Sequence, residues 1–99
     1  MTNYAVLIGR IVSDMKVSKD DTLDVVLAIP RSYKNADGEY TTDFIDCKLC
    51  SELATNTVDY CRRGDLVAIK GSLEKEDGVM FVKAEKISFL ASNKSKDEK

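Results

Sequence analysis

The chain has 99 residues, of which 43% are hydrophobic, 32% charged and 7% aromatic, and its formal net charge is −2. This length predicts one domain with a modest core, and the charge content excludes a membrane-spanning protein. Because the chain contains no histidine, the commonest general base and metal ligand is missing. The first residues have no basic start followed by an apolar stretch, so we expect a cytoplasmic protein.

Hydrophobic periodicity predicts two strands before the first long polar segment. Tyr4–Val12 is apolar on both faces, so we expect both faces of this strand to be covered. Thr22–Pro30 alternates and places four aliphatic side chains on one face: Leu23, Val25, Leu27 and Ile29. Because proline has no N–H to donate to a sheet, Pro30 should end this strand or lie on an edge.

Tyr40–Leu49 predicts a third strand whose residues divide between two faces. The predicted inward side chains are Ile45, Cys47 and Leu49. Period-two alternation then turns Phe44 and Lys48 outward. A large ring on an outward face, such as that of Phe44, either meets a ligand or packs under a loop or another subunit.

Ser51–Arg63 carries the one good helical pattern. Its apolar stripe consists of Leu53, Ala54, Val58 and Cys61. Ser51 is the expected N-cap. Gly64 follows two arginines and is the expected left-handed C′ residue.

The three cysteines are odd in number and occur in a chain without an export signal, so we expect reduced thiols. Cys47 and Cys50 spell C-x-x-C, but residues three apart in a strand point to opposite faces. We therefore interpret both, together with Cys61, as small packing residues and expect no metal or other cofactor.

Two further strands complete the pattern, Asp65–Leu73 and Val79–Leu90. Asp37–Gly38 and Asp77–Gly78 predict hairpin turns, and Gly9 and Gly71 mark bulges or bends inside strands. The elements together predict an all-β fold, a five-stranded OB-fold barrel with one α-helix between strands 3 and 4. A ferredoxin-like sandwich needs a second helix. We expect the OB-fold domain at residues 1–91 and a disordered polar tail at 92–99.

OB barrels bind single strands or sugars on the outer face around their second and third strands. Such binding needs aromatic rings for base stacking and basic groups for the phosphates. The sequence offers the aromatic residues Tyr33 and Phe44 there, with the cations Arg31, Lys34 and Lys48. We expect Lys70, from the strand Asp65–Leu73, to join them on the same face. Taken singly, Tyr33 and each cation also suit an ordinary solvated surface, so only their grouping on one face favours a site.

Five segments carry a family pattern in order along the chain: Tyr4–Ile11 (YAVLIGRI), Thr42–Cys47 (TDFIDC), Tyr60–Val67 (YCRRGDLV), Lys70–Leu73 (KGSL) and Val82–Leu90 (VKAEKISFL). Together they resemble the bacterial-type single-stranded DNA-binding proteins. The resemblance implies a homo-oligomer, tetramer or dimer, that pairs subunits through its first strand and coats single-stranded DNA in replication, recombination and repair. It implies base stacking at Tyr33 and Phe44 and backbone contacts at Arg10, Lys34 and Lys48.

The chain departs from this family pattern at several positions. It has no tryptophan, Cys50 stands where the family commonly has an aromatic residue, and the hairpin segment Glu74–Gly78 is short and acidic. Negative charge occurs where Lys or Arg is expected, at Asp46, Glu52, Glu74 and Glu76. The chain ends without an acidic, Phe-ending tip, so we expect a short variant without the recruitment role of that tip. We also expect weaker and less salt-sensitive binding than in a typical member.

The leading hypothesis is a non-enzymatic single-strand binder, with a preference for DNA over RNA that rests on the resemblance alone. The alternative is an oligomeric OB-fold protein-interaction module, an accessory of a replication or mobile-element system, with weak or no DNA binding. The acidic substitutions favour this alternative. An enzyme has little support, because Asp43 and Asp46 fall on different faces and no phosphate loop or nucleophile–base pair is present.

Overall fold

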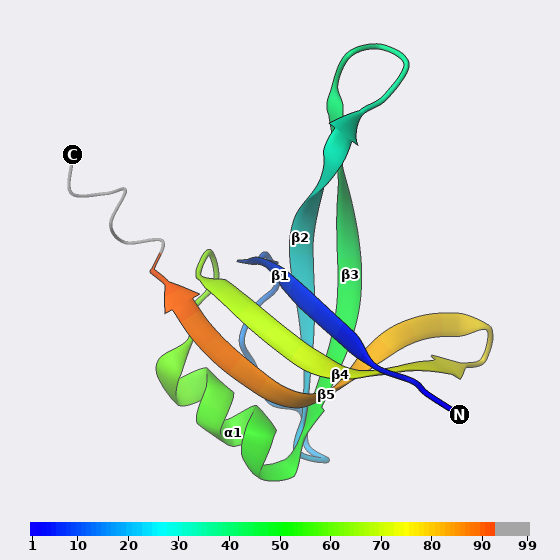
Figure 1. The fold of residues 1–99 in the computed structure, drawn as a ribbon. Helices are drawn as coiled ribbons and strands as arrows, with labels where there is room; N and C mark the ends of the chain where they lie inside the picture. The colour runs from blue at the N-terminus through cyan, green and yellow to red at the C-terminus, as the bar shows by residue number, and fades with distance from the viewer. Residues whose placement is uncertain (93–99) are drawn as a thin grey trace.

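The computed structural model describes residues 1–92 and is a closed five-stranded barrel with one helix (Figure 1). The elements in chain order are β1 (Ala5–Ile11), β2 (Thr22–Lys34), β3 (Tyr40–Cys50), α1 (Ser51–Tyr60), β4 (Leu66–Glu76) and β5 (Val79–Ala91). Around the barrel the strand order is β1-β2-β3-β5-β4. The predicted OB-fold barrel, with its helix between strands 3 and 4, is confirmed.

The barrel consists of two antiparallel sheets joined by short seams. One sheet is formed by β2 and β3, and in the other β4 pairs with both β1 and β5. The seams consist of the pairs Arg10↔Ala28 and Ile11↔Leu27 between β1 and β2, and of the parallel pairs Cys47↔Val82 and Lys48↔Lys83 between β3 and β5. Beyond these short seams the strands diverge.

Alternation along the strands sends every second side chain into the barrel. The buried core is formed by Ile11, Leu23, Val25, Leu27, Cys47, Leu49, Ala54, Cys61, Val67, Ile69, Val82 and Ala84. Helix α1 lies across one end of the barrel and contributes Ala54 to this core (Figure 1). Cys47 and Leu49 are buried as predicted, and Ile45 packs against the core from its edge.

The outer face of β1 differs from the prediction that both of its faces are covered. Val6 and Ile8 are 53% and 54% exposed in the single chain. The pattern is apolar on both faces, but one chain supplies cover for only one of them.

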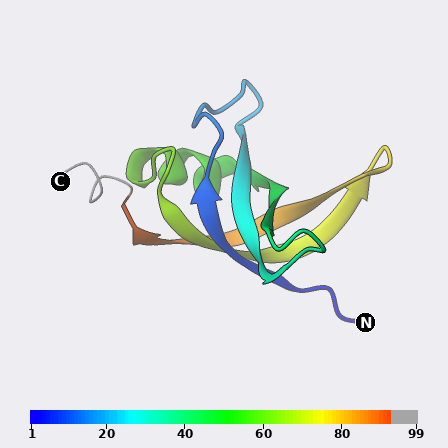
Figure 2. The same ribbon diagram turned by 90° about the horizontal axis from the view of Figure 1, so that it is seen from above.

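Two hairpins project from the barrel in different directions (Figures 1 and 2). The β2–β3 hairpin is the longer one, and residues 30–40 are all exposed. At the tip of the β4–β5 hairpin, Asp77 and Gly78 have φ values of 52° and 82°. Positive φ at both central residues is the property of a type I′ turn, so the hairpin turn predicted at Asp77–Gly78 is confirmed.

Gly71 allows close contact between β4 and β5. A Cβ atom built there would lie 2.0 Å from the carbonyl oxygen of Lys83, and the register shifts between Lys70 and Gly71. Gly9 is also crowded, since a Cβ atom would lie 2.7 Å from Cγ1 of Ile29. The prediction that Gly71 marks a bulge is therefore confirmed, and both glycines are required by the closed shape of the barrel.

Strand β2 continues through Pro30 to Lys34, so Pro30 does not end it. Of the two predicted alternatives, the edge position is correct, because at Pro30 the described pairs join β2 to β3 alone. Pro30 lies opposite Thr42, and the ladder becomes irregular between Pro30 and Lys34. An irregular ladder tolerates a residue without an N–H donor, which explains why the strand survives the proline.

The predicted N-cap of the helix was also wrong. Cys50 is the N-cap and forms no side-chain capping hydrogen bond. Ser51 has a φ of 55°, and its N–H donates to the carbonyl oxygen of Asp21 at 2.8 Å. A contact with a distant loop therefore replaces the local serine cap.

The helix ends at Tyr60 with Cys61 as its C-cap, and not at Arg63 with Gly64 as C′. The N–H of Arg62 donates to the carboxylate of Asp65 at 2.8 Å. This bond holds a separate turn after the helix, in which Gly64 has a φ of 96°.

Within residues 1–92, no helix is long and apolar enough to cross a membrane. Of the tail predicted at 92–99, residues 93–99 lie outside the described part of the chain.

Candidate functional site

Phe44 projects from the outer face of the β2–β3 sheet and is 63% exposed. Its partner on β2 is Ala28, and the partner of Ala28 on β1 is Arg10. The three residues form a row across adjacent strands. Because the side chain of Ala28 is a single methyl group, the ring of Phe44 is not covered from that side. The row thus offers an accessible aromatic ring on β3 and, two strands away on β1, a basic residue.

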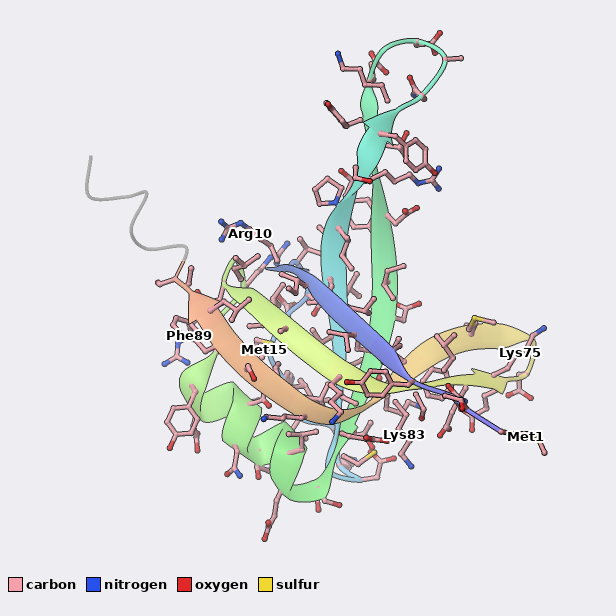
Figure 3. The ribbon with its side chains drawn as sticks, viewed as in Figure 1. Met1, Arg10, Met15, Lys75, Lys83 and Phe89 are labelled. Carbon is pink, nitrogen blue, oxygen red and sulfur yellow. The ribbon has the colours of Figure 1, made fainter. Side chains whose placement is uncertain are left out.

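Arg10 lies at the end of β1 (Figure 3). One of its terminal N–H groups donates to the carbonyl oxygen of Gly64 at 3.1 Å, and the bond is partly buried. A guanidinium carries five N–H donors, so this bond anchors the side chain and leaves further donors for a ligand.

Arg31 forms an ion pair with Asp43 across the β2–β3 hairpin. The pair raises the pKa of Arg31 above its ordinary value, mainly through the hydrogen bond to Asp43 and with a smaller contribution from Tyr33. The same hydrogen bond lowers the pKa of Asp43 below its ordinary value of 3.8. Since Asp43 and Phe44 are consecutive in a strand, Arg31 and Asp43 lie on the opposite side of the hairpin from Phe44.

Tyr33 and Lys34 lie near the far end of the β2–β3 hairpin. Tyr33 is 62% exposed. Lys34 pairs with Tyr40, and its Nζ atom lies 5.8 Å from the centroid of the Tyr40 ring. The projecting hairpin therefore presents aromatic rings and cations to the solvent from more than one side.

Lys48 lies at the seam between β3 and β5. Its Nζ atom is 4.8 Å from the centroid of the Phe81 ring and 3.5 Å from a carboxylate oxygen of Glu76. Through these contacts Lys48 connects β3 to the β4–β5 hairpin. A ligand phosphate at Lys48 would compete with the carboxylate of Glu76.

Lys70 lies on another surface, the outer face of β1, β4 and β5. It pairs with Val6 on one side and with Lys86 on the other. Its Nζ atom is 5.4 Å from the centroid of the Tyr4 ring. The structure therefore does not bring Lys70 together with Phe44, although the sequence pattern grouped them.

A pocket of about 230 Å³ opens where β3 and the β4–β5 hairpin diverge beyond their seam. It is lined by Phe44, Ile45, Asp46, Leu73, Met80, Phe81 and Val82. The β4–β5 hairpin that forms one wall extends past the barrel, with Lys75 near its tip (Figure 3). Most of the lining is apolar, and Asp46 is the one charged residue among the lining residues.

The hairpin residues of this pocket were missed by the sequence reasoning. Leu73, Met80 and Phe81 were assigned to strands, but their place beside Phe44 depends on the parallel seam between β3 and β5. The usable signal was the Asp77–Gly78 turn, which fixes the residues that face each other across the hairpin. It does not reveal which strand lies beside the hairpin.

The described residues contain no group of three or more His, Cys, Asp or Glu side chains placed to hold a metal ion. Cys47, Cys50 and Cys61 are free thiols. Burial, together with the charge of Asp46, raises the pKa of the Cys47 thiol to about 12. Burial also raises the pKa of Cys61. Both groups therefore stay protonated near neutral pH.

Comparison with known proteins gives consistent results. Residues 2–79 match the sequence profile of the Single-strand binding protein family. The chain is 38% identical over 88 residues, which cover 80% of this chain and 78% of the relative, to single-stranded DNA-binding protein B of Bacillus subtilis.

Two solved structures share the fold. The small single-stranded DNA-binding protein of Streptomyces coelicolor superposes with a TM-score of 0.68 at 19% identity and covers 91% of this chain and 95% of its own. An SSB of Plasmodium falciparum in complex with ssDNA superposes with a TM-score of 0.73 at 20% identity and covers 91% and 96%.

Proposed function

The chain belongs to the single-strand binding protein family, and on this basis we propose that it binds single-stranded DNA with little sequence preference. Bases stack on Tyr33 and Phe44, and basic side chains contact the phosphates. Every base has a π-face, so stacking tolerates any sequence. The proposed activity is binding without catalysis, in replication, recombination or repair, and its location is the cytoplasm.

The observation that carries the proposal is the exposure of Phe44 on the outer face of β3. The ring is 63% exposed, with the small Ala28 beside it and Arg10 on the next strand. An aromatic ring left in water costs free energy unless a partner covers it. A stacked base supplies that cover, and the nearby guanidinium suits the phosphate that accompanies it.

The proposed cationic contacts are Arg10, Arg31, Lys34, Lys48 and Lys70. These side chains are not equally available to a phosphate. Arg31 and Lys48 already contact the carboxylates of Asp43 and Glu76, so a phosphate must compete for them. Each lost phosphate contact flattens the dependence of log affinity on log salt by about 0.7 for single strands. We therefore expect weak binding with a shallow salt dependence.

We also propose that the protein is a homo-oligomer, dimer or tetramer, assembled through β1. Val6 and Ile8 form an exposed apolar pair on the outer face of this strand. The described pairs of β1 with β2 involve only its last two residues, so the edge of Ala5–Ile8 facing away from β4 is open. An open edge next to an apolar face is suited to strand pairing with a second copy.

The test is titration of a fluorescent oligothymidine with the purified protein, followed by anisotropy. Phe44→Ala and Tyr33→Ala should each weaken binding by about 1–3 kcal/mol, the usual contribution of one base–aromatic stack. Tyr60→Ala is the matched control, because Tyr60 is 76% exposed but lies on α1. If both site variants bind as tightly as the parent, the stacking proposal is wrong.

The second candidate is a protein-interaction module that uses the same fold without DNA. The carboxylates of Asp43 and Glu76 beside Arg31 and Lys48 favour it, because they reduce the positive charge that phosphates can reach. Absence of any anisotropy change, at both low and moderate salt, would support this candidate over the first.

A further inference from the structure

The pocket between β3 and the β4–β5 hairpin has two phenylalanines and one acidic residue, Asp46, in its lining. Among residues 1–92, Asp43 is paired with Arg31, Glu76 with Lys48 and Asp14 with Arg63. Asp46 forms no such pair in that part of the chain, although it lies within the proposed binding surface. A carboxylate there repels phosphates, but it can accept hydrogen bonds from a ligand group that donates them.

The size and lining of the pocket suit a single nucleobase. Its volume of about 230 Å³ lies below the roughly 300–1,000 Å³ typical of pockets for drug-sized ligands. Phe44 and Phe81 supply aromatic surface, and Leu73 and Met80 supply flexible apolar contacts. In a single strand, the Watson–Crick edge of each base is free for recognition by side chains.

The carboxylate discriminates among the bases by its hydrogen-bonding capacity. An ionised carboxylate only accepts hydrogen bonds, and its two oxygens can accept a parallel pair. The Watson–Crick edge of guanine presents such a pair, N1–H beside the N2 amino group. Thymine presents one N–H between two carbonyl oxygens, and adenine and cytosine each present an acceptor beside their amino group.

We propose that this pocket binds one guanine base, read at its Watson–Crick edge by Asp46, within an otherwise sequence-tolerant contact. The inference rests on the proposed single-strand binding and adds a base preference at one position. Asp46 acts as a specificity-determining residue, whereas Phe44 and Phe81 provide stacking for any base.

The experiment compares three fluorescent oligonucleotides of about 16 nucleotides, the upper site size of one OB fold. One is oligothymidine, one carries a single central deoxyguanosine, and one carries deoxyinosine, which lacks the N2 amino group, at that place. The native protein should bind the deoxyguanosine strand about 5- to 20-fold more tightly than oligothymidine. This preference lies in the lower part of the range for bidentate side chain–base pairs, because the pocket is open to solvent. The affinity for the deoxyinosine strand should lie between the affinities for the other two strands.

The variant Asp46→Asn separates hydrogen bonding to the base from electrostatic repulsion of the phosphates. Loss of the negative charge should strengthen binding of oligothymidine, which does not use the carboxylate. The preference for deoxyguanosine should fall below about twofold, because an amide offers one acceptor and one donor in place of two acceptors. Asp24→Asn is the matched control, since Asp24 is exposed on the neighbouring strand opposite Lys48. That variant should retain the preference.

The outcomes distinguish this inference from the proposed function. If no strand binds, single-strand binding itself is wrong. If all strands bind equally to the native protein, or if Asp46→Asn keeps the full preference, only the guanine pocket is wrong. If Phe81→Ala lowers the mass of the free protein in light scattering, a second copy covers the pocket and the inference is overturned; an unchanged mass supports an accessible pocket.

Discussion

Arg31 and Asp43 bind each other across the β2–β3 hairpin through two hydrogen bonds. Nε of Arg31 donates to Oδ2 of Asp43 at 2.9 Å, and a terminal nitrogen donates to Oδ1 at 3.0 Å. This bidentate geometry holds the guanidinium in one plane. The cation is therefore oriented but partly neutralised, on a surface where phosphates are expected.

Asp43→Asn should strengthen binding of oligothymidine and steepen its salt dependence. The substitution frees Arg31 for one phosphate contact, which adds about 0.7 to the slope of log affinity against log salt for a single strand. Anisotropy titrations at several salt concentrations measure this slope. Asp37→Asn, in the exposed loop of the same hairpin, is the control for charge alone; an equal change in both variants would contradict the idea that Asp43 restrains Arg31.

The pair should persist to unusually low pH. Arg31 lowers the pKa of Asp43 below 3.8, so the ion pair is intact above that value and is lost only as the pH falls through the depressed pKa. A carbon-13 NMR titration of the Asp43 carboxyl group measures this pKa. In Arg31→Gln the pKa should return to about 3.8, and an unchanged value would show that Arg31 is not the cause.

Val6→Lys should lower the mass of the protein measured by light scattering. The variant places a charge on the exposed apolar face of β1 and beside Lys70, its partner on β4. Val79→Lys is the matched control because Val79 is 58% exposed but lies at the tip of the β4–β5 hairpin. A change in mass with Val79→Lys alone would place the interface at the hairpin.

Gly71→Ala should destabilise the folded protein by about 1–3 kcal/mol or more, the usual cost of overpacking. The added Cβ atom would lie 2.0 Å from the carbonyl oxygen of Lys83, and backbone cannot yield as a flexible side chain does. Urea denaturation at fixed protein concentration measures the change. Ser72→Ala, at the next position of the strand, should change stability by less than about 0.5 kcal/mol.

The three thiols should react at different rates with a thiol reagent. Cys47 and Cys61 are 1% and 3% exposed and their pKa values are raised, so little thiolate forms and little reagent reaches it. Cys50 is partly exposed and should react first. Cys50→Ser should remove the fast phase at pH 8, and a fast phase that remained would mean that a core thiol is accessible.

The sequence was sufficient where a local period decides the structure. Alternation in β3 predicted that Cys47 and Leu49 point inward and that Phe44 points outward, and it did so because one face is less exposed than the other along most of the strand. Gly71 was interpreted correctly as a bulge because a glycine inside a strand commonly marks a bulge, a bend or a close backbone contact. These local signals established the barrel and the position of its exposed ring.

Features that depend on distant residues were not predictable in this way. The helix begins after Cys50 because Ser51 is held by Asp21, and it ends at Tyr60 because Arg62 is held by Asp65. The separation of Lys70 from Phe44 follows from the pairing of β4 with β1, which no window of sequence contains. The pairing of Arg31 with Asp43 similarly depends on the register of two strands.

The two short seams of the barrel link DNA binding to the stability of the fold. The row from Arg10 to Phe44 crosses one seam, and the pocket beside Asp46 adjoins the other. A single strand of DNA that contacted both places would bridge the two sheets. Any ligand that binds only the native form stabilises that form by mass action. Such a bridging strand would therefore raise the melting temperature of the protein as the DNA concentration increases.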